Sequence, residues 1–442
     1  MIIREDETVI RRKMTNFEHV KSLPQANCDT NDNQYQNKNK QKLSPMKRVL
    51  YIFALLLATL SIKAQEPMSK VVERGLEFSR KQSLLLAKQL ADKQGRLPRT
   101  YENGQLLTID FHHWCCGFFP GVLWQLYEDK PDEELRHYAE LFTERCEPAK
   151  RLTNTHDLGF MLYCSFGQGY RLTGNPHYLD VIKEGTQSLL TRYNEQLGVI
   201  KSWESNKKWK YPVIIDNMMN LEMLCFMTRM TGNQHYMQVA QRHANTTMKN
   251  HFRKDYSTYH LVSYDPDTGK PQLKQTVQGF ADNSSWARGQ AWGFYGYTMM
   301  YRETHNPKYL KQARRIANFI ASHPHLPEDG VPYWDFDAEG IPNALRDASA
   351  AAIMACAFIE LSQLDRKANA GRWLAMAEKQ IRTLSTPAYL AEAGTQGGFI
   401  LKHGVGHLPG KSEVDVPLTY ADYYYVEALL RMKKLLAHPT DQ

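Results

Sequence analysis

Residues 173–182 read TGNPHYLDVI, residues 231–240 read TGNQHYMQVA, and residues 304–313 read THNPKYLKQA. Each of these three words follows a long run with helical apolar spacing and opens another. Gly or His in the second position suits the end of one helix. Asn suits the cap of the next helix, and Pro (Gln in the second copy) suits its first turn. The words therefore predict three αα-hairpin turns.

Two looser copies extend the repeat: EDKPDEELRHYAELF from Glu128 and SQLDRKANAGRWLAMA from Ser362. The helix before each turn is expected to open some 15 to 18 residues upstream, and a last helix opens at the C-terminal end. The expected opening positions are Trp114, Asp157, Asp216, Arg288, Asp347 and Tyr420.

The helices that these positions open are apolar and rich in small residues almost all round, as in DASAAAIMACAFIELSQL at 347–364. A helix without a polar face belongs in the interior, whereas the helices after the turns are amphipathic and belong outside. Residues 68–92 supply the first outer helix. Six inner and six outer helices in alternation predict an all-α fold, an (α/α)6 barrel. The N-termini of its inner helices meet at one mouth, with short β-hairpins or loops over it.

The first 64 residues differ in composition from the rest. Residues 1–45 are polar and rich in Asn, Gln and Lys, which indicates a disordered leader or a mis-assigned start. Residues 46–64 have a basic start, an apolar run and a small residue at the end, the layout of a signal peptide. The alternative, a membrane anchor, needs about 20 apolar residues. We expect residues 65–442 to form one catalytic domain that is periplasmic or secreted.

Charge and cysteine content limit the classes of function. Residues 65–442 hold 44 basic and 41 acidic residues, a mild excess of +3 without a basic run. Neither a nucleic-acid partner nor, after signal cleavage, a membrane partner is expected. Six cysteines remain in this part, with no CxxC spacing, and are expected to be buried thiols. Adjacent Cys115 and Cys116 lack the further ligands that a metal site needs.

Two carboxylates, Asp157 and Asp216, open consecutive inner helices. Helix capping is one explanation for each, because Asp is a good N-cap. A pair of acids facing one cavity is the other, and glycosidic chemistry uses such pairs. Asp216 ends the apolar run Val213–Ile215. Burial there would raise the pKa of this carboxyl and let it hold a proton near neutral pH.

Aromatic and basic residues accompany the acids. SSWARGQAWGFYGY, from Ser284, places Trp286, Arg288 and Trp292 at the start of an inner helix, and FHHWCCGFFPG adds Trp114. The planar fork of Arg matches a carboxylate or sulfate. Indole faces stack on sugar rings, although core packing is an equal alternative for Trp292.

Further candidates lie in loops. His156 precedes Asp157, and His260 stands in STYHLVSYDPDTG, which predicts a β-hairpin over the mouth. Lys411 and Ser412 lie in the Gly-rich stretch before the last inner helix, where they are expected to meet an anion or to be solvated.

The words DNSSWARGQAWGFYGY, VPYWDFDA, RDASAAAIMACAFIEL, HDLGF and ADYYYVEALLR together resemble glycoside hydrolase family 88, the unsaturated glucuronyl hydrolases. The resemblance covers essentially all of residues 65–442 and implies the same barrel. It also implies removal of a terminal 4,5-unsaturated uronic acid from lyase-cut oligosaccharides, by acid-catalysed hydration of the C4=C5 vinyl ether. It implies no metal or organic cofactor.

By this resemblance, Asp216 is the proton donor and water activator, and Asp157 is the second essential acid. Arg288 is the expected partner of the substrate carboxylate. The sugar-binding positions that the resemblance implies are Trp114, His260, Gln278, Trp286, Arg288 and Trp292.

The chain departs from the family pattern at several places. It has HWCCGF where members have DWTDGF, Thr155 where they have His, and Val277 where they have a sugar-facing His. These departures leave linkage, sulfation and neighbouring sugar open. Two alternatives remain: a rhamnogalacturonyl hydrolase of the related family 105, acting on pectin fragments, and a non-catalytic sugar-binding toroid.

Overall fold

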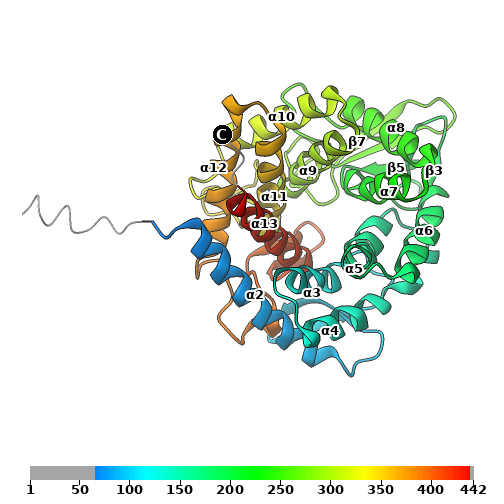
Figure 1. Ribbon diagram of the computed structural model, residues 1–442. Coiled ribbons are helices and arrows are strands. Elements are labelled where there is room, and N and C mark those ends of the chain that lie inside the picture. Colours follow the sequence, from blue (N-terminus) through cyan, green and yellow to red (C-terminus); the bar gives the residue numbers. More distant parts are fainter. Residues whose placement is uncertain (1–64, 439–442) are drawn as a thin grey trace, which may run out of the picture. The chain divides into compact units, whose positions relative to one another are not determined.

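Helices of two kinds alternate along the computed structural model, which describes residues 65–438 (Figure 1). The inner ones are α3 (Phe118–Asp129), the π-helix η2 (Gly159–Gly167) continued by α5 (Gln168–Thr173), α7 (Asn217–Thr231), α9 (Ala287–Thr304), α11 (Ala348–Leu364) and α13 (Thr419–Ala437). The outer ones are α2 (Met68–Leu90), α4 (Glu133–Glu144), α6 (Pro176–Leu190), α8 (Gln234–Asn250), α10 (Pro307–Ser322) and α12 (Lys367–Leu384).

The inner helices form a closed ring. Along the chain each packs against the next, and α13 packs against α3 to complete the circle. Almost every side chain of α11 is buried, in agreement with its all-apolar sequence. The outer helices bury one face each, as their amphipathic patterns predict. The (α/α)6 barrel expected from the repeat is confirmed.

The repeated words form the turns predicted for them. Asn175, Asn233 and Asn306 each cap an outer helix, and each side chain accepts a hydrogen bond from the backbone N–H two residues on. The residues before them have positive φ and end the inner helices; the value is 67° at Gly174 and 52° at His305. Local sequence alone therefore specifies these hairpins.

One inner helix differs from the expectation. The sequence predicted a regular helix opening at Asp157, but residues 159–167 form a π-helix. Gly159 packs directly on α7, where a Cβ atom would stand 2.7 Å from the Cα of Asn220. The backbone N–H of Phe160 donates to Asn220 Oδ1 at 3.0 Å. This bond satisfies a backbone N–H of the first helical turn, which has no partner within its own helix. Widened turns of this kind are frequent at functional sites.

Short antiparallel sheets and single turns join the helices. The strands are β1 (Leu97–Glu102) with β2 (Gln105–Ile109), β3 (Tyr193–Asn194) with β4 (Val199–Ile200), β5 (Tyr211–Ile214) with β6 (Leu261–Tyr264) and β7 (Pro271–Gln275), and β8 (Gly404–His407) with β9 (Ser412–Val416). Short 3-10 turns are η1 (Glu147–Arg151) and η3 (Gln396–Gly398). The hairpin predicted after His260 is β6–β7, and β5 adds a third strand to it.

The described residues from Glu66 onward form one compact unit. The predicted leader (1–45) and signal peptide (46–64) lie outside the described residues. Within 65–438, the six cysteines are unpaired and buried. No group of metal-binding side chains gathers in that part of the chain. Its helices are also too short or too polar to cross a bilayer.

Candidate active site

A cavity of about 220 Å³ lies where the N-terminal ends of the inner helices meet. It brings together residues more than 100 positions apart in the sequence. It is smaller than the roughly 300–1,000 Å³ typical of drug-sized ligands, so it suits a single small ring. Its lining consists of Trp114, Asn154, Thr155, His156, Asp157, Ser202, Trp203, Ile214, Asp216, Gln278 and Arg288.

Both predicted acids line this cavity, and neither caps a helix. Asp216 follows β5 and takes the N-cap position of α7, yet its side chain accepts no capping hydrogen bond. Asp347, at the corresponding position of α11, does cap, because its carboxylate accepts the Ser349 N–H at 3.0 Å. Capping therefore does not account for Asp216, and the explanation by a shared cavity remains.

Burial governs the chemistry of Asp216. The residue is 8% exposed, and its Oδ1 atom has no hydrogen-bond partner. Removal from water raises the pKa of this carboxyl to about 7. The charge of Arg288 opposes this rise, and the charge of Asp157 adds to it. The Trp292 indole lies close enough to favour the charged form, although its Nε1 makes no hydrogen bond of normal geometry. Asp216 can thus hold a proton near neutral pH.

His260 fixes the environment of that carboxyl. Its Nδ1 accepts the backbone N–H groups of Val277 at 3.0 Å and Gln278 at 3.2 Å. The ring proton must then sit on Nε2, which lies 3.7 Å from Asp216 Oδ1. Burial lowers the pKa of His260 well below its usual value. A neutral imidazole therefore presents an N–H toward Asp216.

Asp157 has a different setting. Thr155 donates its hydroxyl to Asp157 Oδ2 at 2.9 Å, and His156 Nε2 lies 3.3 Å from Oδ1. The side chain of His156 is almost fully buried, and desolvation lowers its pKa. The two acids therefore occupy one cavity with unequal surroundings, one hydrogen-bonded and one unpartnered.

Arg288 lines the cavity, but the protein itself holds most of its guanidinium. Nη1 donates to Asp347 Oδ2 at 3.0 Å and to the carbonyl of Val405 at 2.5 Å, and Nη2 donates to the carbonyl of Gly406 at 2.6 Å. These contacts fix the side chain rigidly between α11 and β8. The open fork expected from the sequence is thus largely occupied by protein acceptors.

The predicted tryptophans take different places. Trp114 lines the cavity, whereas Trp286 and Trp292 are almost fully buried beside it. The Trp286 ring contacts His260 at 4.7 Å between centroids. Phe160 lies against Trp114 at 5.6 Å and Trp292 at 5.2 Å. We call Trp114, Phe160 and Trp292 the aromatic floor, because these rings close the barrel beneath the cavity.

Gln278 lines the cavity and donates from Nε2 to the carbonyl of Gly406. Lys411 and Ser412, by contrast, are not among the lining residues. They lie at the tip of the β8–β9 hairpin, and the Ser412 hydroxyl accepts a hydrogen bond from Arg99 at 3.0 Å. The structure thus gives the Ser412 hydroxyl a protein partner in place of the expected anion.

Two residues that line the cavity, Ser202 and Trp203, were not predicted from the sequence. Trp203 and Ser202 come from the loop between β4 and β5, and Trp203 packs edge-on against Trp209 at 5.5 Å. Two tryptophans in the lysine-rich segment 201–210 were the available signal. Both tryptophans are half-buried, and Trp203 is the one that lines the cavity.

Comparisons with known proteins agree with this geometry. The family model described as Glycosyl Hydrolase Family 88 matches residues 90–322. An unsaturated glucuronyl hydrolase from Formosa agariphila is 47% identical over 325 residues, 73% of this chain and 80% of that protein. An unsaturated chondroitin disaccharide hydrolase from Streptococcus agalactiae is 34% identical, covering 76% of this chain and 85% of its own.

Among solved structures, an unsaturated glucuronyl hydrolase specific for heparin is 43% identical and superposes with a TM-score of 0.80. The match covers 83% of this chain and 98% of that one. The range matched by the family model includes all the residues that line the cavity, from Trp114 to Arg288. The chain therefore belongs to glycosyl hydrolase family 88, the family of the unsaturated glucuronyl hydrolases.

Proposed function

We propose that Asp216 is the catalytic acid with which this glycosidase removes the terminal 4,5-unsaturated uronic acid from glycosaminoglycan disaccharides. The observation that carries the assignment is the state of Asp216 in the cavity: buried, unpartnered at Oδ1, and with a pKa of about 7. An acid that works near neutral pH needs such a pKa. A non-catalytic sugar-binding toroid would have no use for it.

The reaction follows from the chemistry of the vinyl ether. Asp216 gives its proton to C4, and the positive charge that develops at C5 is shared with the ring oxygen. Water then adds at C5 and returns a proton to the Asp216 carboxylate. The resulting hemiketal opens and releases the neighbouring sugar. Asp216 thus acts first as acid and then as base, and it ends the cycle protonated.

Asp157 and His260 are proposed to support this cycle. The negative charge of Asp157 favours the protonated form of Asp216 before the transfer. The Nε2–H of His260 faces the carboxylate that Asp216 becomes after the proton transfer. At 3.7 Å this N–H makes no hydrogen bond, but its dipole favours the carboxylate without repelling the cation that develops on the sugar.

A panel of lyase-cut disaccharides tests the function. Loss of the ultraviolet absorbance of the conjugated double bond is followed on heparin, chondroitin, hyaluronan and pectin fragments. Because the heparin-specific enzyme shares 43% identity with this chain, heparin disaccharides are expected to be the best substrates. Turnover confined to pectin fragments would transfer the assignment to the chemistry of family 105.

We also propose that the protein is exported after cleavage following Ala64. The basic, apolar and small-residue order of 46–64 supports this proposal. N-terminal sequencing of protein from the producing cell is expected to start at Gln65, in the periplasmic or secreted fraction. An intact N-terminus in the cytoplasmic fraction would refute it.

A further inference from the structure

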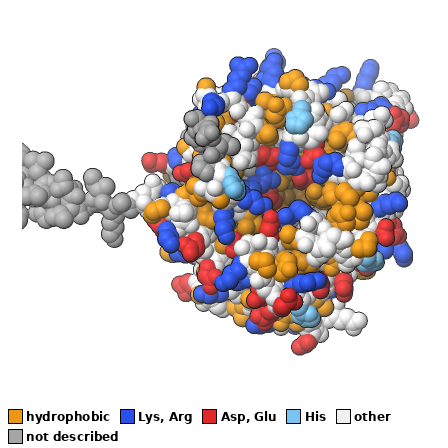
Figure 2. Space-filling view, in the orientation of Figure 1, with side chains coloured by type: hydrophobic (Ala, Val, Ile, Leu, Met, Phe, Trp, Pro, Cys, Tyr) orange, Lys and Arg blue, Asp and Glu red, His pale blue; other side chains and the backbone are white. Residues whose placement is uncertain are grey.

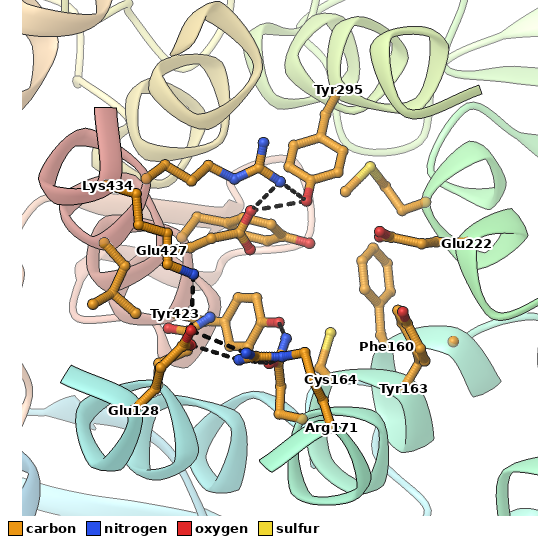
Figure 3. Close-up of a pocket in the computed structure, with 17 residues that line it drawn as sticks. Glu128, Phe160, Tyr163, Cys164, Arg171, Glu222, Tyr295, Tyr423, Glu427 and Lys434 are labelled. Carbon is orange, nitrogen blue, oxygen red and sulfur yellow. Dashed lines mark hydrogen bonds and ion pairs between the residues drawn. The ribbon is translucent and has the colours of Figure 1, made fainter. Parts of the chain in front are cut away.

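Carboxylates inside the barrel can be balanced by basic side chains. Glu427, half-buried in the wall of a second cavity of about 230 Å³, binds Arg431 at 2.7 Å (Figure 3). Asp347, which is fully buried, binds Arg288 at 3.0 Å. On the face shown in Figure 2, acidic and basic side chains likewise stand together around a central hollow. A buried acid without a basic partner therefore needs another explanation.

Asp335 is such an acid. Its side chain is fully buried, and no Lys, Arg or His of the described residues forms an ion pair with it. Its partners are three neutral donors: the backbone N–H of Phe280 at 2.9 Å, the hydroxyl of Ser284 at 2.7 Å and the backbone N–H of Asp337 at 2.9 Å. Burial raises the pKa of this carboxyl, because the charged form loses its water. The fold keeps a costly group here, and the group binds the backbone near Phe280.

The amide that Asp335 binds belongs to a segment, residues 276–280, that also reaches the catalytic site. In this segment the backbone N–H groups of Val277 and Gln278 donate to His260 Nδ1 at 3.0 and 3.2 Å. Because Nδ1 accepts both bonds, the ring proton sits on Nε2, on the side of the catalytic acid. Asp335 thus holds the same segment that fixes the tautomer of His260.

The segment is too tightly packed to absorb a movement at one end. Gly279 stands in its middle. A Cβ atom there would lie 2.6 Å from Thr276 Oγ1, 3.0 Å from Trp286 Cβ and 3.1 Å from Asp335 Oδ2. Two residues of chain extend at most about 7 Å. A shift of the amide that Asp335 holds therefore moves the amides that bind His260.

We propose that Asp335 is a positioning residue of the reaction. Through segment 276–280 it keeps His260 in the tautomer that directs Nε2–H toward Asp216. Asp335 does not line the catalytic cavity, so it acts on the substrate only through other residues. This role rests on the proposed function, in which Asp216 is the catalytic acid.

Two variants disturb the segment, and a third is the matched control. Asp335→Ala removes the acceptor of the Phe280 N–H, whereas Gly279→Ala forces a methyl group into the segment and leaves Asp335 in place. Asp337→Ala removes an exposed carboxylate that accepts the backbone N–H of Ser285 at 2.9 Å. Thermal unfolding checks that each variant is folded. If Asp335→Ala does not fold, Gly279→Ala decides the test.

The first measurement is ¹⁵N NMR of the whole protein with labelled histidine, near neutral pH. The signals of His260 are those missing from His260→Gln. The wild type should show a protonated Nε2 and an unprotonated Nδ1. In Asp335→Ala and Gly279→Ala the two signals should move toward each other, because both tautomers become populated, and in Asp337→Ala they should stay. Unchanged signals in the first two variants would overturn the proposal, since the Gln278 bond to Gly406 would then hold the segment alone.

The second measurement is turnover of an unsaturated disaccharide. Asp335→Ala should lower kcat about tenfold, the size of one neutral polar interaction. In the His260→Gln background the same change should cause no further fall. Falls that multiply would overturn the proposal, because Asp335 would then act by another route. The NMR measurement needs no turnover, so it decides the role of Asp335 even if Asp216→Asn keeps wild-type activity and another group proves to be the acid.

Discussion

Replacing Asp216 by Asn removes the acid and should also stabilise the protein. The folded carboxyl has a pKa of about 7 against an ordinary value of 3.8. Between these two values the folded state keeps a proton that the unfolded chain releases, so stability falls as the pH rises through this window. The full difference, roughly three pH units, corresponds to about 4 kcal/mol of stability lost above pH 7. The amide that replaces the carboxyl carries no charge and avoids that loss.

The expected result therefore has two parts. At about pH 8 the unfolding midpoint of Asp216→Asn should lie about 5 °C above wild type, from the entropy of unfolding of a domain this size. Near pH 4 the two midpoints should coincide, because the wild-type carboxyl is then protonated in the folded state. Turnover of an unsaturated disaccharide should fall by about 10²–10⁴, the contribution of a positioned proton donor.

Differential scanning calorimetry at the two pH values and the ultraviolet assay measure both parts. Asp157→Asn is the matched control, because its carboxylate accepts a hydrogen bond from Thr155 and its loss should not stabilise the fold. If Asp216→Asn melts at or below the wild-type temperature at pH 8, the buried carboxyl is not costly and the argument from desolvation fails. Wild-type turnover in that variant would show that another group supplies the proton.

Three other outcomes are expected. The kcat/KM of the wild type should decline as the pH rises through about 7, where Asp216 loses its proton; a profile that stays flat well above this value contradicts the assignment. Asp347→Ala should destabilise the protein by roughly 3–5 kcal/mol in urea unfolding, because Arg288 is left buried without its 3.0 Å partner. Asp347→Asn should destabilise the protein less. Equal unfolding midpoints for Asp347→Ala and wild type would show that the β8 carbonyl groups hold Arg288 alone. Dialysis against EDTA should leave turnover unchanged, since the residues of 65–438 gather no metal-binding group; activity restored by added cation would contradict this.

Much of the fold was predictable because its signals are local. Asn175, Asn233 and Asn306 cap their helices through bonds that span two residues, so the sequence around each turn contains all of the information. The alternation of inner and outer helices follows from apolar patterns within single helices. The barrel is then the simplest closed packing of six such hairpins.

The site was predictable only in part, because its details depend on contacts between distant segments. The hydrogen bond between Phe160, at the start of the π-helix, and Asn220 joins residues 60 positions apart. The fixed state of Arg288 depends on Asp347 and the carbonyl groups of β8, none of which is near it in sequence. The position of Trp203 depends on how a loop folds over the mouth. A motif names the residue types, but the three-dimensional packing decides their partners.

The aromatic floor has a consequence for the kind of chain that can react. Trp114, Phe160 and Trp292 pack ring against ring. The catalytic cavity is therefore closed at its inner end and opens only at the mouth of the barrel. A polymer cannot thread through it, so an internal residue never reaches Asp216. Each cycle must admit one chain end, and the freed uronate must leave by the way it came before the next end can enter.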